Sequence, residues 1–204
     1  MRKRTTFVIC AFLSLSVFGG DLQLPAPRKT GGMPLREALA ARQSARAFSD
    51  QFLDNQLLSD LLWAACGINR DGGKRTAPSA RNSQEIDLYV ALPTGLYLYD
   101  AAANRLIQKM TADIREKTGV QPFTQKAPVN LIYVADYDRL RGEKEFYSAT
   151  DTGFISQNVY LFCASEGLNT VVLGWVEKED LHKAMKLTPS QHVILTQPVG
   201  FPPK

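Results

Sequence analysis

The chain has 204 residues, and its 24 Lys and Arg against 20 Asp and Glu give a net charge of +4. Arg2, Lys3 and Arg4 supply most of this excess, so the rest of the chain is close to neutral. Nucleic-acid-binding domains carry basic patches on the folded domain itself. The charge distribution therefore argues against nucleic acid as a partner.

The first 20 residues have the pattern of a secretory signal peptide. A basic start precedes an apolar run of about 15 residues, and small residues follow at Gly19 and Gly20. The run is shorter than the roughly 20 residues that a bilayer-spanning helix needs. We therefore expect an exported protein, periplasmic or extracellular, with no membrane span once residues 1–20 are removed. An uncleaved anchor is the alternative.

Two cysteines, Cys66 and Cys163, remain after the predicted signal peptide. Export permits a disulfide between them. Both lie in apolar helical patterns, however, where cysteine behaves as a small hydrophobic residue. We favour two buried free thiols, and the disulfide stays open as the alternative. The chain has 2 histidines and no clustered cysteines, so we expect no metal site.

Residues 21–33 are rich in Pro and Gly and are predicted to be a linker that leads into one domain at 34–204. Pro34 suits the first turn of a helix, and Asp54 and Gly67 are typical of the start and end of a second helix. Residues 67–84 are polar and are predicted to be a long loop. Long loops in compact domains are often functional.

Strand and helix patterns alternate irregularly through the rest of the chain. The predicted strands are 87–92, 96–99, 105–108, 129–135, 171–176 and 192–196, with a hairpin joining the second and third. The predicted helices are 111–117, 177–185 and a long one that starts at Thr150 or Asp151 and ends at Gly167. This order indicates an α+β fold, a small mixed sheet wrapped by helices. No Gly-x-Gly-x-x-Gly follows a strand, which argues against a Rossmann site.

The first candidate site is Arg42-x-Ser44-x-Arg46, where a helix gives way to irregular chain. An extended backbone places alternate side chains on one side. Two guanidiniums and a hydroxyl can then converge on one phosphate, which Arg binds through paired hydrogen bonds. The alternative is an ordinary solvated basic turn.

Two more candidates lie further along the chain. In the long loop, Asn82 and Gln84 offer donors and acceptors that suit a pyrimidine-like ring edge, and Ser79 can donate to a ring carbonyl. An Asx-type turn is the alternative there. Gly174 interrupts an apolar strand, where glycine often marks the close approach of a ligand. A simple bulge is the alternative at that position.

The order of these segments resembles the FMN-dependent nitroreductase family. That family has Arg-x-Ser-x-Arg near the start of its domain, then a Pro-Ser-x-x-Asn-x-Gln loop, which is Pro78 to Gln84 here. A helix resembling Asp151-x-Gly153…Gln157-Asn158 follows, then Glu166-Gly167-Leu168 and a strand with glycine. The resemblance covers roughly residues 34–200. Segments 62–70 and 75–80 look especially like the family's thiazoline/oxazoline dehydrogenase branch.

The resemblance implies a nitroreductase-like fold with a central, mostly antiparallel sheet, and an interlocked homodimer with FMN at its interface. By this analogy Arg42, Ser44 and Arg46 hold the phosphate and ribityl end, and the backbone of Leu173 and Gly174 meets the ring near N5. The residues that would come from the other subunit to cover the ring are Pro78, Ser79, Ala80 and Asn82, with Gln84 as a further contact. No side chain is assigned as a catalytic acid.

Two departures from the family pattern stand out. Family chains usually continue to a basic residue that joins the phosphate site, whereas this chain ends Phe201-Pro202-Pro203-Lys204. Lys204 is therefore the candidate for that role. The family loop often reads Asn-x-Gln-Pro-Trp, but here Glu85 and Ile86 follow Gln84. We expect the substrate-facing wall to differ accordingly.

The leading interpretation is an FMN-dependent oxidoreductase that passes a hydride from reduced flavin to a flat electrophile such as a nitroaromatic or a quinone. NAD(P)H is the candidate electron donor, although nicotinamide cofactors are scarce outside the cytoplasm. One alternative is a dehydrogenase of a thiazoline-like substrate. Another is a flavin- or partner-binding module without turnover.

Overall fold

The computed structural model describes residues 20–204, so the predicted signal peptide lies outside the described residues except for Gly20. One sheet has the strand order β1-β6-β5-β4-β7-β9-β8, and each pairing recorded within it is antiparallel. Its strands are β1 (Leu22–Gln23), β4 (Ile86–Leu92), β5 (Gly95–Asp100), β6 (Arg105–Met110), β7 (Val129–Asp136), β8 (Asn169–Thr170) and β9 (Gln191–Gly200). This arrangement confirms the α+β fold class.

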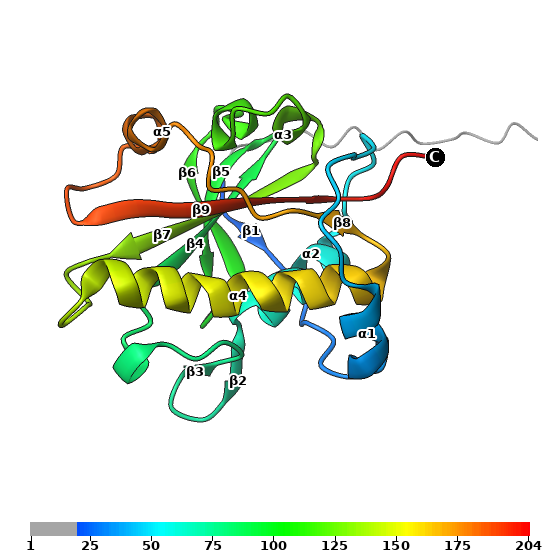
Figure 1. Ribbon diagram of the computed structural model, residues 1–204, viewed down its shortest axis with the longest axis horizontal. Coiled ribbons are helices and arrows are strands. Elements are labelled where there is room, and N and C mark those ends of the chain that lie inside the picture. The colour runs from blue at the N-terminus through cyan, green and yellow to red at the C-terminus, as the bar shows by residue number, and fades with distance from the viewer. Residues whose placement is uncertain (1–19) are drawn as a thin grey trace, which may run out of the picture.

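Helices cover both faces of this sheet (Figure 1). They are α1 (Leu35–Ala41), α2 (Asn55–Cys66), α3 (Phe123–Lys126), α4 (Lys144–Glu166) and α5 (Lys178–Met185), with two short 3₁₀ turns, η1 (Ala80–Asn82) and η2 (Arg115–Thr118). Strands β2 (Ile68–Arg70) and β3 (Lys74–Arg75) form a separate small hairpin inside the segment that we expected to be a loop.

Two apolar clusters form the core, one on each face of the sheet. Side chains alternate along a strand, so Leu88 and Leu131 join α2 and α4 in one cluster. Their neighbours Tyr89 and Ile132 point the other way and join α5 in the second cluster. Strand β7 is therefore buried on both faces, as its continuous apolar sequence predicted.

Local signals placed α2 correctly. Asp54 accepts the Leu57 amide at 2.8 Å, and Gly67 ends the helix. The predicted hairpin is also confirmed, because β5 and β6 pair antiparallel with Tyr99 opposite Leu106.

Cys66 and Cys163 are both free and buried, and burial raises the pKa of the Cys66 thiol to about 11.

Three local predictions were wrong. Helix α4 begins at Lys144 rather than at Thr150 or Asp151, because the Asp151 carboxylate binds another segment instead of capping a helix. The predicted strand at 171–176 is reduced to an isolated bridge between Leu173 and Thr196. The predicted helix at 111–117 is only the short 3₁₀ turn η2.

Residues 21–33, which we expected to be a linker, lie along the domain as an ordered segment that we call the strap. Its first residues form β1 at the edge of the sheet beside β6. Arg28 then binds Asp60 of α2 through its backbone amide (2.7 Å) and its Nε (2.6 Å). The amide of Met33 donates to Ser165 of α4 at 2.8 Å. Within residues 20–204, no helix is both long and apolar enough to cross a bilayer.

Candidate functional site

The segment after α1 brings two of its three predicted phosphate ligands together. The Ala45 amide donates to the Thr170 carbonyl at 2.9 Å, which holds the segment beside β8. Ser44 Oγ lies 2.8 Å from the Tyr160 hydroxyl, and the Arg42 guanidinium lies over the Tyr160 ring, 5.3 Å from its centroid. Arg46 follows on the same segment and is exposed.

Neither Arg42 nor Arg46 forms an ion pair with a carboxylate of residues 20–204. Other arginines in the same structure are paired, as Arg139 is with Asp87 at 2.7 Å. Two guanidiniums without a carboxylate partner on one short segment can bind an anion through charge-assisted hydrogen bonds. The geometry therefore favours the phosphate-site interpretation over an ordinary basic turn.

Tyr160 of α4 is a site residue that sequence reasoning missed. Besides meeting Ser44, its hydroxyl accepts the Val172 amide at 2.9 Å. It thus joins the Arg42–Arg46 segment to the segment that contains Leu173 and Gly174. In the sequence Tyr160 is one more residue on the apolar face of a helix, and nothing local marks its hydroxyl.

Gly174 is exposed and offers its backbone outward. Leu173 is fixed by two hydrogen bonds with Thr196, at 2.8 and 3.1 Å. The next amide, that of Gly174, donates to no other described residue. A Cβ built on Gly174 would meet only Leu195 Cδ2, at 3.7 Å. Packing within the chain therefore does not require glycine here, whereas the close approach of a flat ligand to this amide would.

The loop Pro78–Gln84 is held by its own hydrogen bonds. Ser79 Oγ accepts the Gln84 amide at 3.0 Å, and the Gln84 side chain accepts from Arg75 and donates to Asn82 Oδ1. Arg81 and Asn82 have φ near +56°, and Gln84 has φ of +47°. Non-glycine residues adopt this region only at some cost, and such strain clusters at functional sites. Gln84 serves the loop itself, while Asn82 remains exposed.

The predicted site has two halves, the Arg42–Arg46 segment and the Pro78–Gln84 loop, and each half contacts α4. Within one chain these two contacts lie far apart. Ala80 donates its amide to Asp151 Oδ2 at 2.7 Å, whereas Ser44 meets Tyr160. Nine residues along a helix span about 13.5 Å and two and a half turns, so these contacts lie on opposite sides of α4. In Figure 1 the chain around β2 and β3 lies near the first half of α4, and α1 lies at its far end.

The C-terminal tail runs beside the candidate phosphate segment. The Ser49 amide donates to the Phe201 carbonyl at 2.9 Å, which places the tail next to the chain that follows Arg46. Lys204 is exposed three residues further on, and no hydrogen bond or ion pair joins its side chain to another described residue. Its predicted role in the phosphate site stays a prediction.

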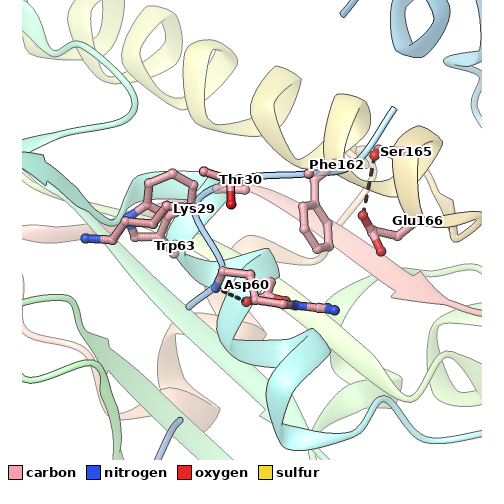
Figure 2. A pocket seen from close by; sticks show the side chains of 11 residues that line it. Lys29, Thr30, Asp60, Trp63, Phe162, Ser165 and Glu166 are labelled. Atoms are coloured by element: carbon pink, nitrogen blue, oxygen red, sulfur yellow. Dashed lines mark hydrogen bonds and ion pairs between the residues drawn. The ribbon is translucent and has the colours of Figure 1, made fainter. Parts of the chain in front are cut away.

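A cavity of about 450 Å³ lies elsewhere, between the strap, α2 and α4. Figure 2 shows Asp60 and Trp63 on one side of it and Phe162, Ser165 and Glu166 on the other. Two of its polar side chains are already engaged, since Asp60 binds Arg28, and Ser165 accepts the Met33 amide. None of the predicted cofactor ligands lines this cavity, so its size does not make it the site.

Comparison with known proteins identifies the relatives of this chain. The model of the nitroreductase family matches residues 39–201. The "Putative nitroreductase MJ1384" of Methanocaldococcus jannaschii is 28% identical, and the alignment covers 88% of this chain and 96% of that protein. A solved structure from Ralstonia eutropha JMP134, described as a putative nitroreductase, is 43% identical with a TM-score of 0.86, covering 90% of each chain.

More distant solved structures share the fold. One from Desulfovibrio desulfuricans, described as a complex with FMN, is 20% identical with a TM-score of 0.64, covering 85% of this chain and 89% of that one. The NADPH:FMN oxidoreductase of Vibrio harveyi, complexed with NAD+, is 18% identical with a TM-score of 0.62. The match covers 83% of this chain and 69% of that one.

Proposed function

Because this chain belongs to the nitroreductase family, we propose that it is an oxidoreductase with FMN as its cofactor. One observation carries the proposal: the Tyr160 hydroxyl connects the Arg42–Arg46 segment to the segment that contains Leu173 and Gly174. Unpaired Arg42 and Arg46 provide cations for a phosphate, and the free amide of Gly174 lies on the segment that the same tyrosine holds. This combination fits a ligand that is anionic at one end and flat at the other.

The chain's own residues bind and orient this cofactor. Arg42, Ser44 and Arg46 would hold the phosphate and the ribityl chain, while the backbone of Leu173 and Gly174 would lie against the ring. FMN supplies hydride transfer when it is bound, and the protein places and tunes it. A donor such as the Gly174 amide near the reacting edge stabilises negative charge that develops there. No buried general acid lies on this surface, so we expect solvent to deliver protons.

We also propose that the active form is a homodimer. The loop that carries Ser79 and Asn82 lies on the side of α4 opposite Tyr160, so one chain cannot close both halves around one ligand. Exposed apolar side chains on α1 and α4 fit an interface, because Leu35 is 65% and Phe146 61% exposed. A second copy would bring its loop over the first chain's ring.

The proposed substrates are flat electrophiles such as nitroaromatics or quinones. Trp175 follows Gly174 directly and is 69% exposed, so its indole is available to stack on an aromatic ring. NAD(P)H is the proposed electron donor, by analogy with the fold neighbour that is named for NADPH and complexed with NAD+. A substrate that is dehydrogenated instead would reverse the direction of the same hydride transfer.

Export remains part of the proposal. Asp21 accepts the Gln108 amide at 3.0 Å, and Leu22 already pairs with β6. Cleavage after Gly20 would therefore leave the contacts of the strap intact. N-terminal sequencing of the protein recovered from cell fractions tests this, and an intact Met1 on a cytoplasmic protein would refute it.

The first experiment is an absorbance spectrum of the purified protein with and without added FMN. A bound-flavin band near 450 nm at about one FMN per chain would support the cofactor assignment. Anaerobic NADH or NADPH should then bleach the band, and a nitroaromatic or quinone should restore it. A protein that takes up no FMN would contradict the proposal, and bound FMN that neither nucleotide reduces would reject NAD(P)H as donor.

A further inference from the structure

The Tyr160 hydroxyl makes two hydrogen bonds, and the direction of one of them is fixed. It accepts the Val172 amide at 2.9 Å, because a backbone N–H can only donate. Its other neighbour is Ser44 Oγ at 2.8 Å, where the positions of the two oxygens allow either hydroxyl to donate. No third hydrogen bond of this hydroxyl is recorded within residues 20–204. The surroundings of the two hydroxyls therefore decide which of them donates.

Burial favours Tyr160 as the donor. Tyr160 is 7% exposed, whereas Ser44 is exposed. If Ser44 donated, the Tyr160 hydrogen would have no acceptor among the described residues, and an unpaired polar hydrogen inside a protein is unfavourable. If Tyr160 donates, the Ser44 hydrogen faces outward and needs no partner within its own chain. Only this second arrangement satisfies both hydroxyls.

The chemistry of the two groups favours the same direction. A phenol is a stronger hydrogen-bond donor and a weaker acceptor than an alkyl hydroxyl, because its ring draws electron density from the oxygen. The Arg42 guanidinium lies over the Tyr160 ring, 5.3 Å from its centroid, and its charge draws further density toward the ring face. Tyr160 is therefore the donor in this pair, and Ser44 Oγ is the acceptor.

We propose that Tyr160 is a positioning residue that makes this site specific for a phosphate: it donates to Ser44 Oγ and leaves the Ser44 hydrogen free for the ligand. This inference rests on the proposed function, in which Arg42, Ser44 and Arg46 hold the phosphate of FMN. The segment then offers donors from two guanidiniums and one hydroxyl. A phosphate dianion, whose oxygens only accept, matches these donors. Riboflavin ends in a neutral hydroxyl instead and forms weaker hydrogen bonds with them.

Removing only the Tyr160 hydroxyl has two separable effects. Tyr160→Phe keeps the ring beneath Arg42 but leaves Ser44 without its donor, so the Ser44 hydroxyl can turn away from the phosphate. The Val172 amide also loses its acceptor, which loosens the segment that carries Gly174. The second effect acts at the flavin ring and is shared by FMN and riboflavin, whereas the first acts on the phosphate of FMN alone.

The affinities of the apoprotein for FMN and for riboflavin, measured by titration of flavin fluorescence, test the inference. In Tyr160→Phe the Kd for FMN should rise about tenfold more than the Kd for riboflavin. Ser44→Ala should show the same selective loss. The double variant should lose no more than either single variant, because both changes remove the same hydrogen bond to the phosphate.

Tyr147→Phe is the matched control. Tyr147 lies on the same helix, and no hydrogen bond of its hydroxyl is recorded within residues 20–204, so this variant should bind both flavins as the unmodified protein does. Equal losses for the two flavins in Tyr160→Phe would mean that the hydroxyl only holds the Val172 amide. That result, the absence of any loss, or losses that add in the double variant would overturn the inference.

A second measurement keeps the inference testable if Tyr160→Phe fails to fold. NMR follows exchange of the Tyr160 hydroxyl hydrogen in FMN-free protein through the deuterium isotope shift on the ring carbon Cζ. A hydrogen that is donated to Ser44 exchanges slowly, and exchange should be at least about tenfold faster in Ser44→Ala, which lacks the acceptor. Equal rates in the two proteins would show that Tyr160 is not the donor. A protein that binds neither flavin would refute the proposed function, while the exchange rates would still judge the direction of this hydrogen bond.

Discussion

Arg42 shows how much a single side chain contributes when nothing in its own chain neutralises it. Its guanidinium lies over the Tyr160 ring, and none of the ion pairs recorded in residues 20–204 involves it. A cation held by an aromatic face keeps its hydrogen-bond donors free for a ligand. The free donors, rather than the motif alone, make this residue the best single test of the phosphate site.

Arg42→Ala should weaken FMN binding by about 2 kcal/mol, or roughly 30-fold in Kd, because it removes charge-assisted hydrogen bonds to the phosphate. Isothermal titration calorimetry of the apoprotein measures the effect. Arg36→Ala on the exposed side of α1 removes the same charge and should leave Kd within about twofold. Equal losses in both variants would mean that only overall charge matters.

Gly174 allows a second test at the residue scale, because its surroundings leave space for a side chain. A Cβ there meets only Leu195, at an ordinary 3.7 Å, so Gly174→Val should leave the midpoint of urea unfolding almost unchanged. The same side chain would occupy the approach to the Gly174 amide and should weaken FMN binding at least about tenfold. A stable variant with unchanged FMN affinity would show that the ring lies elsewhere.

At the scale of elements, local signals predicted structure only where they were not overridden by distant contacts. Helix α2 matched its predicted ends because Asp54 caps it and Gly67 stops it within the helix itself. The start of α4 was missed because Asp151, a good cap by composition, binds Ala80 instead. The strand after α4 was overestimated because Tyr160 takes the Val172 amide that a regular strand would have used.

The candidate site, like the helices and strands, could be predicted from the sequence only where local motifs indicate it. The motif order indicated Arg42, Ser44 and Gly174, and the fold places all three beside segments that Tyr160 joins. Tyr160 itself was not predictable, because a tyrosine on an apolar helix face gives no sign of which backbone its hydroxyl will meet. Glu85 stood out only as a departure from the family loop, and its complete burial is set by the fold rather than by a local signal.

The strap is the element whose importance the sequence most understated. Asp60 of α2 is 3% exposed and accepts hydrogen bonds from the Arg28 amide, Arg28 Nε and Gln56. Asp60→Ala should destabilise the protein by about 2 kcal/mol, because it leaves the Arg28 backbone amide unsatisfied and removes the partner of the Arg28 guanidinium. Urea unfolding measures this, with the exposed Asp50→Ala as control. A stability equal to that of the control would mean that the strap contributes nothing.

At the scale of the whole molecule, α4 lies between the two halves of the site. Whether two chains together form each site can therefore be tested without a structure of the dimer. If Arg42 of one copy and Asn82 of the other serve the same FMN, each symmetric dimer of Arg42→Ala or of Asn82→Ala has two damaged sites. A mixed dimer instead has one site with both substitutions and one site with neither.

Mixing the two variants after reversible dissociation should therefore restore tight FMN binding at about a quarter of the sites, because half of the dimers are mixed and each has one intact site. Titration with FMN should show this fraction at the original affinity, and each variant alone should show none. If one chain supplied both residues to its own FMN, every site would keep one substitution, and no mixture would recover tight binding. The result thus decides whether the dimer is needed to complete the site or only accompanies it.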